Sequence, residues 1–145
     1  MLRLCGPALL PSVIIAVATA PAALAEGAVA LGRPASIVRD GVAFGWSIGH
    51  ATPDEAERRA LDECHRNPDA PGHTRRLCIV IQNFRNQCVA GALDPDAGTP
   101  GFGWAVADTA AVAAERALAM CRNSSPVNRK DFCRIASTGC DGTAK

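Results

Sequence analysis

Two short stretches of the chain alternate large and very small side chains with a period of two. In residues 42–49 the large side chains are Val42, Phe44, Trp46 and Ile48, separated by alanine, glycine and serine. Residues 102–107 repeat the pattern with phenylalanine, tryptophan and valine. This period is typical of a β-strand, whose successive side chains point to opposite faces. The all-small face predicts that another backbone element approaches each strand closely.

A helix is predicted after each aromatic strand. Thr52 is a good N-cap, Pro53 suits the first helical position, and Glu55 completes a capping box. Small residues and a leucine then recur at helical spacing, at Ala56, Ala60, Leu61 and Cys64. The same pattern returns in the second half of the chain, so we expect helices near residues 53–65 and 110–122.

Further strands are predicted on both sides of these units. One precedes each aromatic strand (27–32 and 88–93), and one follows each helix (77–84 and 132–138). Because residues 77–84 are apolar on both faces, we expect them to form a central strand. Residues 36–38 could add a short strand, since Asp40-Gly41 is a hairpin signal.

The chain therefore consists of one sequence module that occurs twice. Thr52 aligns with Thr109, and the alignment continues without a gap to Cys64 on Cys121. Two copies are too few for a solenoid and indicate one domain with approximate two-fold symmetry. The predicted fold is α+β: two pseudo-symmetric β-β-α-β repeats, about 26–88 and 89–140. They form a mainly antiparallel sheet with two helices packed on it.

The N-terminus has the features of a secretory signal peptide over residues 1–25. Arg3 is followed by an uncharged apolar run that ends in the small-x-small sequence Ala23-Leu24-Ala25. Three prolines interrupt the run, which disfavours a membrane anchor. Cleavage leaves 14 basic and 14 acidic residues. A neutral chain without a long basic run disfavours nucleic-acid binding, and no later segment is apolar enough to span a membrane. The expected location is exported, either periplasmic or extracellular.

Six of the seven cysteines remain after cleavage removes Cys5. They are Cys64, Cys78, Cys88, Cys121, Cys133 and Cys140. An even number in an oxidising compartment predicts three disulfides. Metal binding is the rival interpretation, because His65 and His73 lie between two cysteines, but the close ligand spacing of zinc sites is missing.

The repeat also predicts the pairing of the cysteines. Cys64 ends its helix on the buried face, and Cys78 opens the strand that returns beneath that helix, so the two should pair. Cys121 and Cys133 stand in the same relation. Cys88–Cys140 is the remaining pair, and we expect it to clamp the two copies together.

The order of these motifs resembles a family of small exported bacterial proteins, the domain-of-unknown-function 4189 family. The matching pieces in the first copy are Gly27-Ala28-Val29-Ala30, Gly45-Trp46, Thr52, Ala56, Ala60-Leu61, Cys64, Cys78 and Asn86-Gln87-Cys88. Those in the second copy are Gly103-Trp104, Thr109, Ala113, Ala117-Leu118, Cys121, Cys133 and Cys140. The resemblance covers nearly all of the mature chain and implies an exported domain with no established catalytic mechanism, so it brings no site residues. The chain departs from the family pattern in its long Cys64–Cys78 and Cys121–Cys133 loops, where a specific activity could lie.

No catalytic set emerges from the sequence. Ser47 and His50 would point to opposite faces of a strand, no nucleophile-elbow motif is present, and the six cysteines are assigned to disulfides. Residues 94–98 slightly resemble a calcium loop but lack the spacing and the distal glutamate of an EF-hand. We expect an ordinary turn there, no metal and no cofactor.

Two groups of residues are candidates for binding. Trp46 and Trp104 belong to an aromatic face that is either core or, if open, a surface for a sugar or a peptide. The two Cys–Cys loops are basic, with Arg66, Arg75 and Arg76 in the first and Arg129 and Lys130 in the second. Such charges either complement helix C-termini or meet an acidic partner.

The leading hypothesis is a non-catalytic, exported binding domain that engages a protein partner or envelope component through its loops. One alternative is a cell-envelope hydrolase or inhibitor acting near an anionic polymer. The other is a small redox or stress protein, which would need a labile disulfide.

Cleavage can be tested by intact mass spectrometry of the exported protein. We expect the mass of a chain that begins at Glu26. A mass that retains Cys5 would contradict both the signal peptide and the even number of cysteines.

Overall fold

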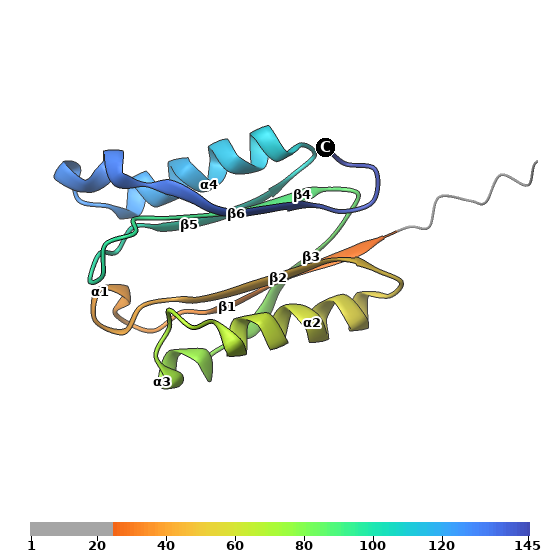
Figure 1. The fold of residues 1–145 in the computed structure, drawn as a ribbon, viewed down its shortest axis with the longest axis horizontal. Coiled ribbons are helices and arrows are strands. Elements are labelled where there is room, and N and C mark those ends of the chain that lie inside the picture. Colours follow the sequence, from red (N-terminus) through yellow and green to blue (C-terminus); the bar gives the residue numbers. More distant parts are fainter. Residues whose placement is uncertain (1–24) are drawn as a thin grey trace, which may run out of the picture.

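The computed structural model describes residues 25–145 and arranges their strands in two three-stranded antiparallel sheets. The first sheet has the order β2-β1-β3, from β1 (Glu26–Gly32), β2 (Ala43–His50) and β3 (Ile79–Arg85). The second has the order β5-β4-β6, from β4 (Cys88–Leu93), β5 (Phe102–Ala107) and β6 (Arg134–Cys140). The sheets lie face to face with a long helix on each outer side (Figure 1). The predicted α+β fold of two β-β-α-β repeats is confirmed, although each repeat forms its own antiparallel sheet and the two do not join into one. The predicted signal peptide, apart from Ala25, lies outside the described residues.

The two long helices begin at the predicted caps. In α2 (Pro53–Arg66) the Thr52 hydroxyl accepts a hydrogen bond from the Glu55 N–H at 3.3 Å. In α4 (Ala110–Ser124) the Thr109 hydroxyl accepts from the Val112 N–H, also at 3.3 Å. Each bond satisfies one of the N–H groups that the first helical turn leaves free.

Three short helical segments complete the chain: α1 (Ile37–Asp40), α3 (Gly72–Arg75) and the 3₁₀ helix η1 (Val127–Phe132). The suggested short strand at 36–38 is wrong, because α1 occupies that place. Ser36 caps this turn by accepting from the Arg39 N–H, and Gly41, with φ of +64°, ends it. A cap residue and a glycine spaced in this way stabilise a helical turn rather than a strand.

The prediction that residues 77–84 form a central strand is also wrong. The central strands are β1 and β4, whereas β3 is an edge strand in which Ile79 is 64% exposed. The central position is crowded by a helix on one face and the other sheet on the opposite face. The small residues Ala28, Val29 and Ala30 fit it and are fully buried, while the larger side chains of β3 lie at the margin.

Each long helix packs on a face made of small residues. A Cβ atom at Gly45 would come within 2.5 Å of the Ala60 carbonyl oxygen, and one at Gly103 would come equally close to the Cys121 nitrogen. The large side chains that alternate with these small residues point to the opposite face of each sheet, away from the helix. Val29, Phe84 and Val89 are buried there with Trp104 packed against them, so the aromatic strands form the core between the sheets.

All three predicted disulfides are present, with Cα–Cα distances of 6.0 Å for Cys64–Cys78, 6.0 Å for Cys121–Cys133 and 4.0 Å for Cys88–Cys140. The expected role of the third is wrong. Cys88 opens β4 and pairs with Cys140 of β6, so this bond lies within the second sheet and does not join the two copies.

The first sheet carries an ion pair where the second carries this disulfide. Glu26 opens β1 as Cys88 opens β4, and its register partner in β3 is Arg85. Arg85 donates a hydrogen bond to the nearly buried Glu26 carboxylate. At equivalent positions of the repeat, an ion pair therefore links β1 to β3 and a disulfide links β4 to β6.

The two copies are tied together at one end by Asp141, which is fully buried. Its carboxylate accepts from the Gly49 N–H at the end of β2 at 2.8 Å and from the Asn86 N–H at 3.3 Å. Asn86 stands in the β3–β4 connection, at the same end of the molecule as the C-terminus (Figure 1). This carboxylate thus fixes the second copy to two parts of the first.

The correspondence between the ion pair and the disulfide can be tested with Glu26→Cys/Arg85→Cys. We expect a fourth disulfide, because the two positions face each other in the register that Cys88 and Cys140 use. Closing a loop with a sequence separation of 59 residues should stabilise the fold by up to about 4 kcal/mol on the chain-entropy model.

The reference for this experiment is Glu26→Ser/Arg85→Ser, which removes the ion pair without adding a bond. Non-reducing peptide mapping identifies the bridge, and urea unfolding measures the free energy of unfolding. Free thiols at both positions would show that the two sheets are not equivalent at this point.

Candidate functional site

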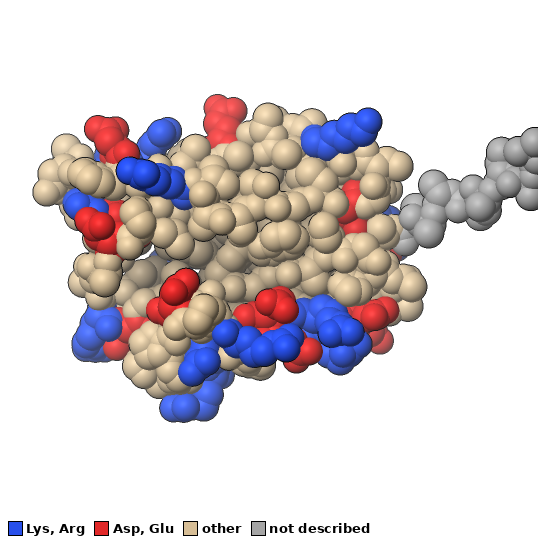
Figure 2. Space-filling model, in the orientation of Figure 1, with Lys and Arg blue, Asp and Glu red and all other residues tan. Residues whose placement is uncertain are grey.

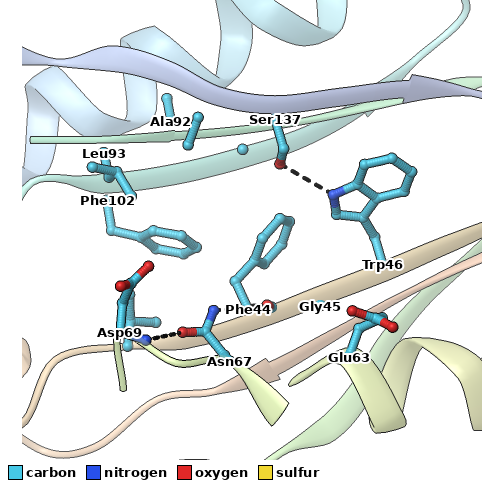
Figure 3. A pocket seen from close by; sticks show the side chains of 13 residues that line it. Phe44, Gly45, Trp46, Glu63, Asn67, Asp69, Ala92, Leu93, Phe102 and Ser137 are labelled. Atoms are coloured by element: carbon cyan, nitrogen blue, oxygen red, sulfur yellow. Dashed lines mark hydrogen bonds between the residues drawn. The ribbon is translucent and has the colours of Figure 1, made fainter. Parts of the chain in front are cut away.

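An open cleft lies between the two sheets toward the end that carries α1. Its volume is ≈ 430 Å³, and its walls include Phe44 and Trp46 of β2, Phe102 of β5 and Ser137 of β6. Figure 3 shows these side chains converging from the two sheets, with Asn67 and Asp69 beside them. We call this space the inter-sheet cleft. It is the part of the inter-sheet layer that side chains do not fill.

Phe44, Trp46 and Phe102 form what we call the aromatic floor of the cleft. Contacts between the two sheets hold these side chains in place. The rings of Phe44 and Phe102 meet edge to face, with centroids 5.5 Å apart and an interplanar angle of 65°. The Trp46 indole N–H donates to the Ser137 hydroxyl at 3.1 Å. A Cβ at Gly91 would lie 2.9 Å from the Phe44 ring, so a glycine is needed where this ring packs against β4 of the opposite sheet.

A second hollow of ≈ 600 Å³ continues the cleft. The two share Val42, Asp69, Leu93 and Phe102 as lining residues. The walls of the second hollow come from α1 and from the loop of residues 94–101. Together the two hollows form one elongated groove that runs from the aromatic floor to this rim.

The 94–101 loop is fixed by a long-range ion pair that the sequence analysis missed. Arg129 of η1 donates to both oxygens of the Asp94 carboxylate, at 2.8 and 2.6 Å, and to Asp96 at 2.6 Å. Its guanidinium also stacks over the Phe132 ring, 4.0 Å from the centroid. The hydrogen bonds from Arg129 lower the pKa of Asp94 below its ordinary value, and the two carboxylates raise the pKa of Arg129.

Charged side chains lie mainly along the upper and lower margins of the face in Figure 2, and the band between them is largely uncharged. At the cleft itself the nearest charges are the carboxylates of Glu63 and Asp69. In Figure 3, Asp69 rises from the lower wall toward Phe102, and Glu63 lies below Trp46. The cleft therefore combines an aromatic floor with an acidic margin.

Comparison with known proteins places this architecture in a family. The family model described as "Domain of unknown function (DUF4189)" matches residues 27–140. The chain belongs to the DUF4189 family. Among solved structures, this DUF4189 domain is similar to the NMR structure of Rv1813c from Mycobacterium tuberculosis, with 18% sequence identity, 95% of each chain covered and a TM-score of 0.42. No curated protein matches the sequence.

The structure separates the two tryptophans that were candidates for binding. Both pack against the buried cluster between the sheets, but Trp46 also lines the cleft, whereas Trp104 lines neither hollow. The aromatic face of this DUF4189 domain thus packs against the core and also borders the cleft. It is open at Phe44, Trp46 and Phe102.

The basic candidates are also divided. Arg129 is committed to its two carboxylates, and Arg66 lies 3.4 Å from Glu63 in an exposed pair. Lys130 is exposed on η1. Arg75 and Arg76 belong to the α3 turn, and both guanidinium groups lie near Gly72.

The two basic loops lie at one end of the molecule but on opposite outer sides, with both sheets between them (Figure 1). They do not form one continuous basic surface.

The described residues contain neither a metal-binding cluster nor a membrane-spanning helix. Within residues 25–145, histidine, cysteine and carboxylate side chains nowhere gather in threes that could hold a metal ion. In the same range no helix has the length and hydrophobicity needed to cross a bilayer. Three disulfides in such a domain fit an exported protein.

Asp69 was not among the predicted binding residues. It lies in the long Cys64–Cys78 loop, which the comparison with the family pattern had marked as a place for specific activity. The residue itself could not be selected, because Asn67-Pro68-Asp69 looks like an ordinary helix stop.

The Asp94–Arg129 pair gives a prediction about acid stability. Arg129 holds the pKa of Asp94 below its ordinary value of 3.8 in the folded protein. The stability that this pair contributes is fully present above that value and is lost as the pH falls through the lower folded-state pKa. We expect Asp94→Asn to be less stable than the wild type at neutral pH and to lose less further stability below about pH 4.

Urea unfolding of the two proteins, followed by tryptophan fluorescence across this pH range, measures the effect. Asp131→Asn, which removes an exposed carboxylate on the same 3₁₀ helix, should keep the wild-type acid profile. Equal acid sensitivity in Asp94→Asn and the wild type would show that the pair does not stabilise the fold.

Proposed function

We propose that this DUF4189 protein is a non-catalytic, exported binding domain that takes up an extended segment of a protein partner in the inter-sheet cleft. The observation that carries the proposal is the open aromatic floor. In a domain of this size most large apolar side chains are needed for the core. Phe44, Trp46 and Phe102 nevertheless line an accessible space of ≈ 430 Å³.

The shape of the groove favours an extended chain over a compact ligand. Each hollow has the volume of a small-molecule site, but the two adjoin through Phe102 and Leu93 and form one elongated groove. Extended peptides bind in this way, with side chains occupying successive pockets. The rim is formed by loops, in keeping with a domain that engages its partner through them.

The cysteines and the charges support a binding role over the alternatives. All six cysteines of the described chain are paired, and five of them are buried, which disfavours thiol chemistry. An anionic polymer would call for a continuous basic surface. The two basic loops lie on opposite outer sides, and Arg129 is already bound to carboxylates. Export to the periplasm or beyond is part of the proposal.

The proposal can be tested by filling the cleft. Ala136 lines it from β6 and is exposed, so Ala136→Trp should block the space without disturbing buried packing. The mature protein, residues 26–145, is panned against random linear heptapeptides displayed on phage. We expect it to retain peptides that Ala136→Trp does not bind.

Thr138→Trp is the matched control, because Thr138 is exposed on the same strand and lines neither hollow. It should bind the selected peptides as the wild type does. Peptides that bind Ala136→Trp and the wild type equally, or a wild type that retains no peptide, would overturn the proposed function.

A further inference from the structure

The charges along the groove do not balance. Among the described residues, Arg39 is the only basic one that lines the groove. Its guanidinium donates to both oxygens of Asp40, at 3.0 and 2.8 Å. At the rim, Arg129 binds both Asp94 and Asp96 and offsets one of their two negative charges. Together these five groups carry a net charge of −1, but an arginine holds each of their carboxylates.

The acidic margin at the aromatic end is not neutralised in the same way. Glu63 has an exposed partner, Arg66, at 3.4 Å, and an ion pair this open to water contributes little. Within the described residues, no basic side chain lies within 4.0 Å of the Asp69 carboxylate, and its oxygens accept no hydrogen bond. The cleft therefore carries an unmatched negative charge beside its aromatic floor.

Asp69 is held in a fixed relation to this floor. Its backbone N–H donates to the Asn67 side-chain oxygen at 3.0 Å, and the Asn67 side-chain nitrogen donates to the Phe44 carbonyl oxygen at 3.1 Å. One asparagine thus ties the turn that carries the carboxylate to the strand that carries the ring. The backbone that carries the carboxylate is positioned before any ligand arrives.

The floor itself suits a cation with an aliphatic stem. Phe44 and Phe102 meet edge to face, and both residues line the cleft. A guanidinium or ammonium group is attracted to such a ring within about 6 Å of its centroid. Arginine and lysine side chains can lay their methylene groups on apolar surface and keep the charged end near water.

We infer that the bound segment places an arginine or lysine side chain across Phe44 and Phe102, with its charged end against the Asp69 carboxylate. The inference rests on the proposed function and specifies the chemistry of its ligand. Within residues 25–145 this site occurs once. The alignment that sets Asn67 on Ser124 sets Asp69 on Pro126, so the second copy has no carboxylate at this place.

The test uses the heptapeptides that the wild type retains and Ala136→Trp does not. We expect arginine or lysine to be enriched among them. In the tightest arginine peptide, citrulline is then substituted for the arginine, which removes the charge and keeps the shape. The dissociation constant, measured by isothermal titration calorimetry, should rise about three- to thirty-fold.

Asp69→Asn should bind the arginine and citrulline peptides with nearly equal affinity and the citrulline peptide as the wild type does. Asp54→Asn is the matched control, because it removes an exposed carboxylate from the first turn of α2, away from the cleft, and should keep the preference for arginine. Rescue by Asp69→Glu would confirm that charge is the cause.

Cleft-dependent peptides without a basic residue, or equal affinity of the wild type for arginine and citrulline, would overturn this inference and leave the proposed function standing. Peptide binding that Ala136→Trp does not weaken would overturn both.

Discussion

The close approach of each long helix to an edge strand is the constraint on which the rest of the structure depends. The backbone of α2 lies so near β2 that position 45 has no room for a side chain, and α4 imposes the same on position 103. On the helix side, alanines and a cysteine complete the contact. Every large side chain of these strands must then point to the opposite face. A second sheet of the same kind covers that face, which is a physical reason for the module to occur twice.

The two copies satisfy equivalent needs with different chemistry. In the first, the buried hydroxyl of Thr74 donates to the Asp40 carbonyl oxygen at 2.6 Å, which ties the first Cys–Cys loop to α1. In the second, Arg129 ties the other Cys–Cys loop to the 94–101 loop. Each disulfide loop thus holds the connection between the first two strands of its own copy. Those two connections are the rim of the groove.

Local patterns were enough to predict much of this fold. Strand alternation, the capping residues and the helix-to-strand disulfides each depend on neighbours in sequence, and the structure bears them out. The position of β3 could not be predicted from apolarity alone, since crowding selects small side chains such as Ala28 for the centre and leaves Ile79 at the edge.

Long-range partners were harder to predict. Because Cys88 and Cys140 are the third cysteines of the two aligned copies, the alignment placed Cys88 at the end of the first copy. In the structure Cys88 opens β4, and the strand register sets Cys140 opposite it. The pairing of Arg129 with Asp94 spans 35 residues and leaves no local signal. Which part of the aromatic face stays open likewise depends on how the two sheets meet. The sequence therefore could not distinguish Trp46 from Trp104 as a binding residue.

The cleft is open at one end of the inter-sheet layer because the sheets are joined firmly at the other. There the chain passes from β3 to β4, and the buried carboxylate of Asp141 holds Gly49 and Asn86 together. At the α1 end the aromatic rings meet directly, but the rim segments are tied outward to their own disulfide loops by Thr74 and Arg129. These bonds oppose closure of the sheets over the aromatic floor. A ligand would therefore enter a space that the fold already keeps open, and its binding would not have to offset the cost of separating two packed sheets.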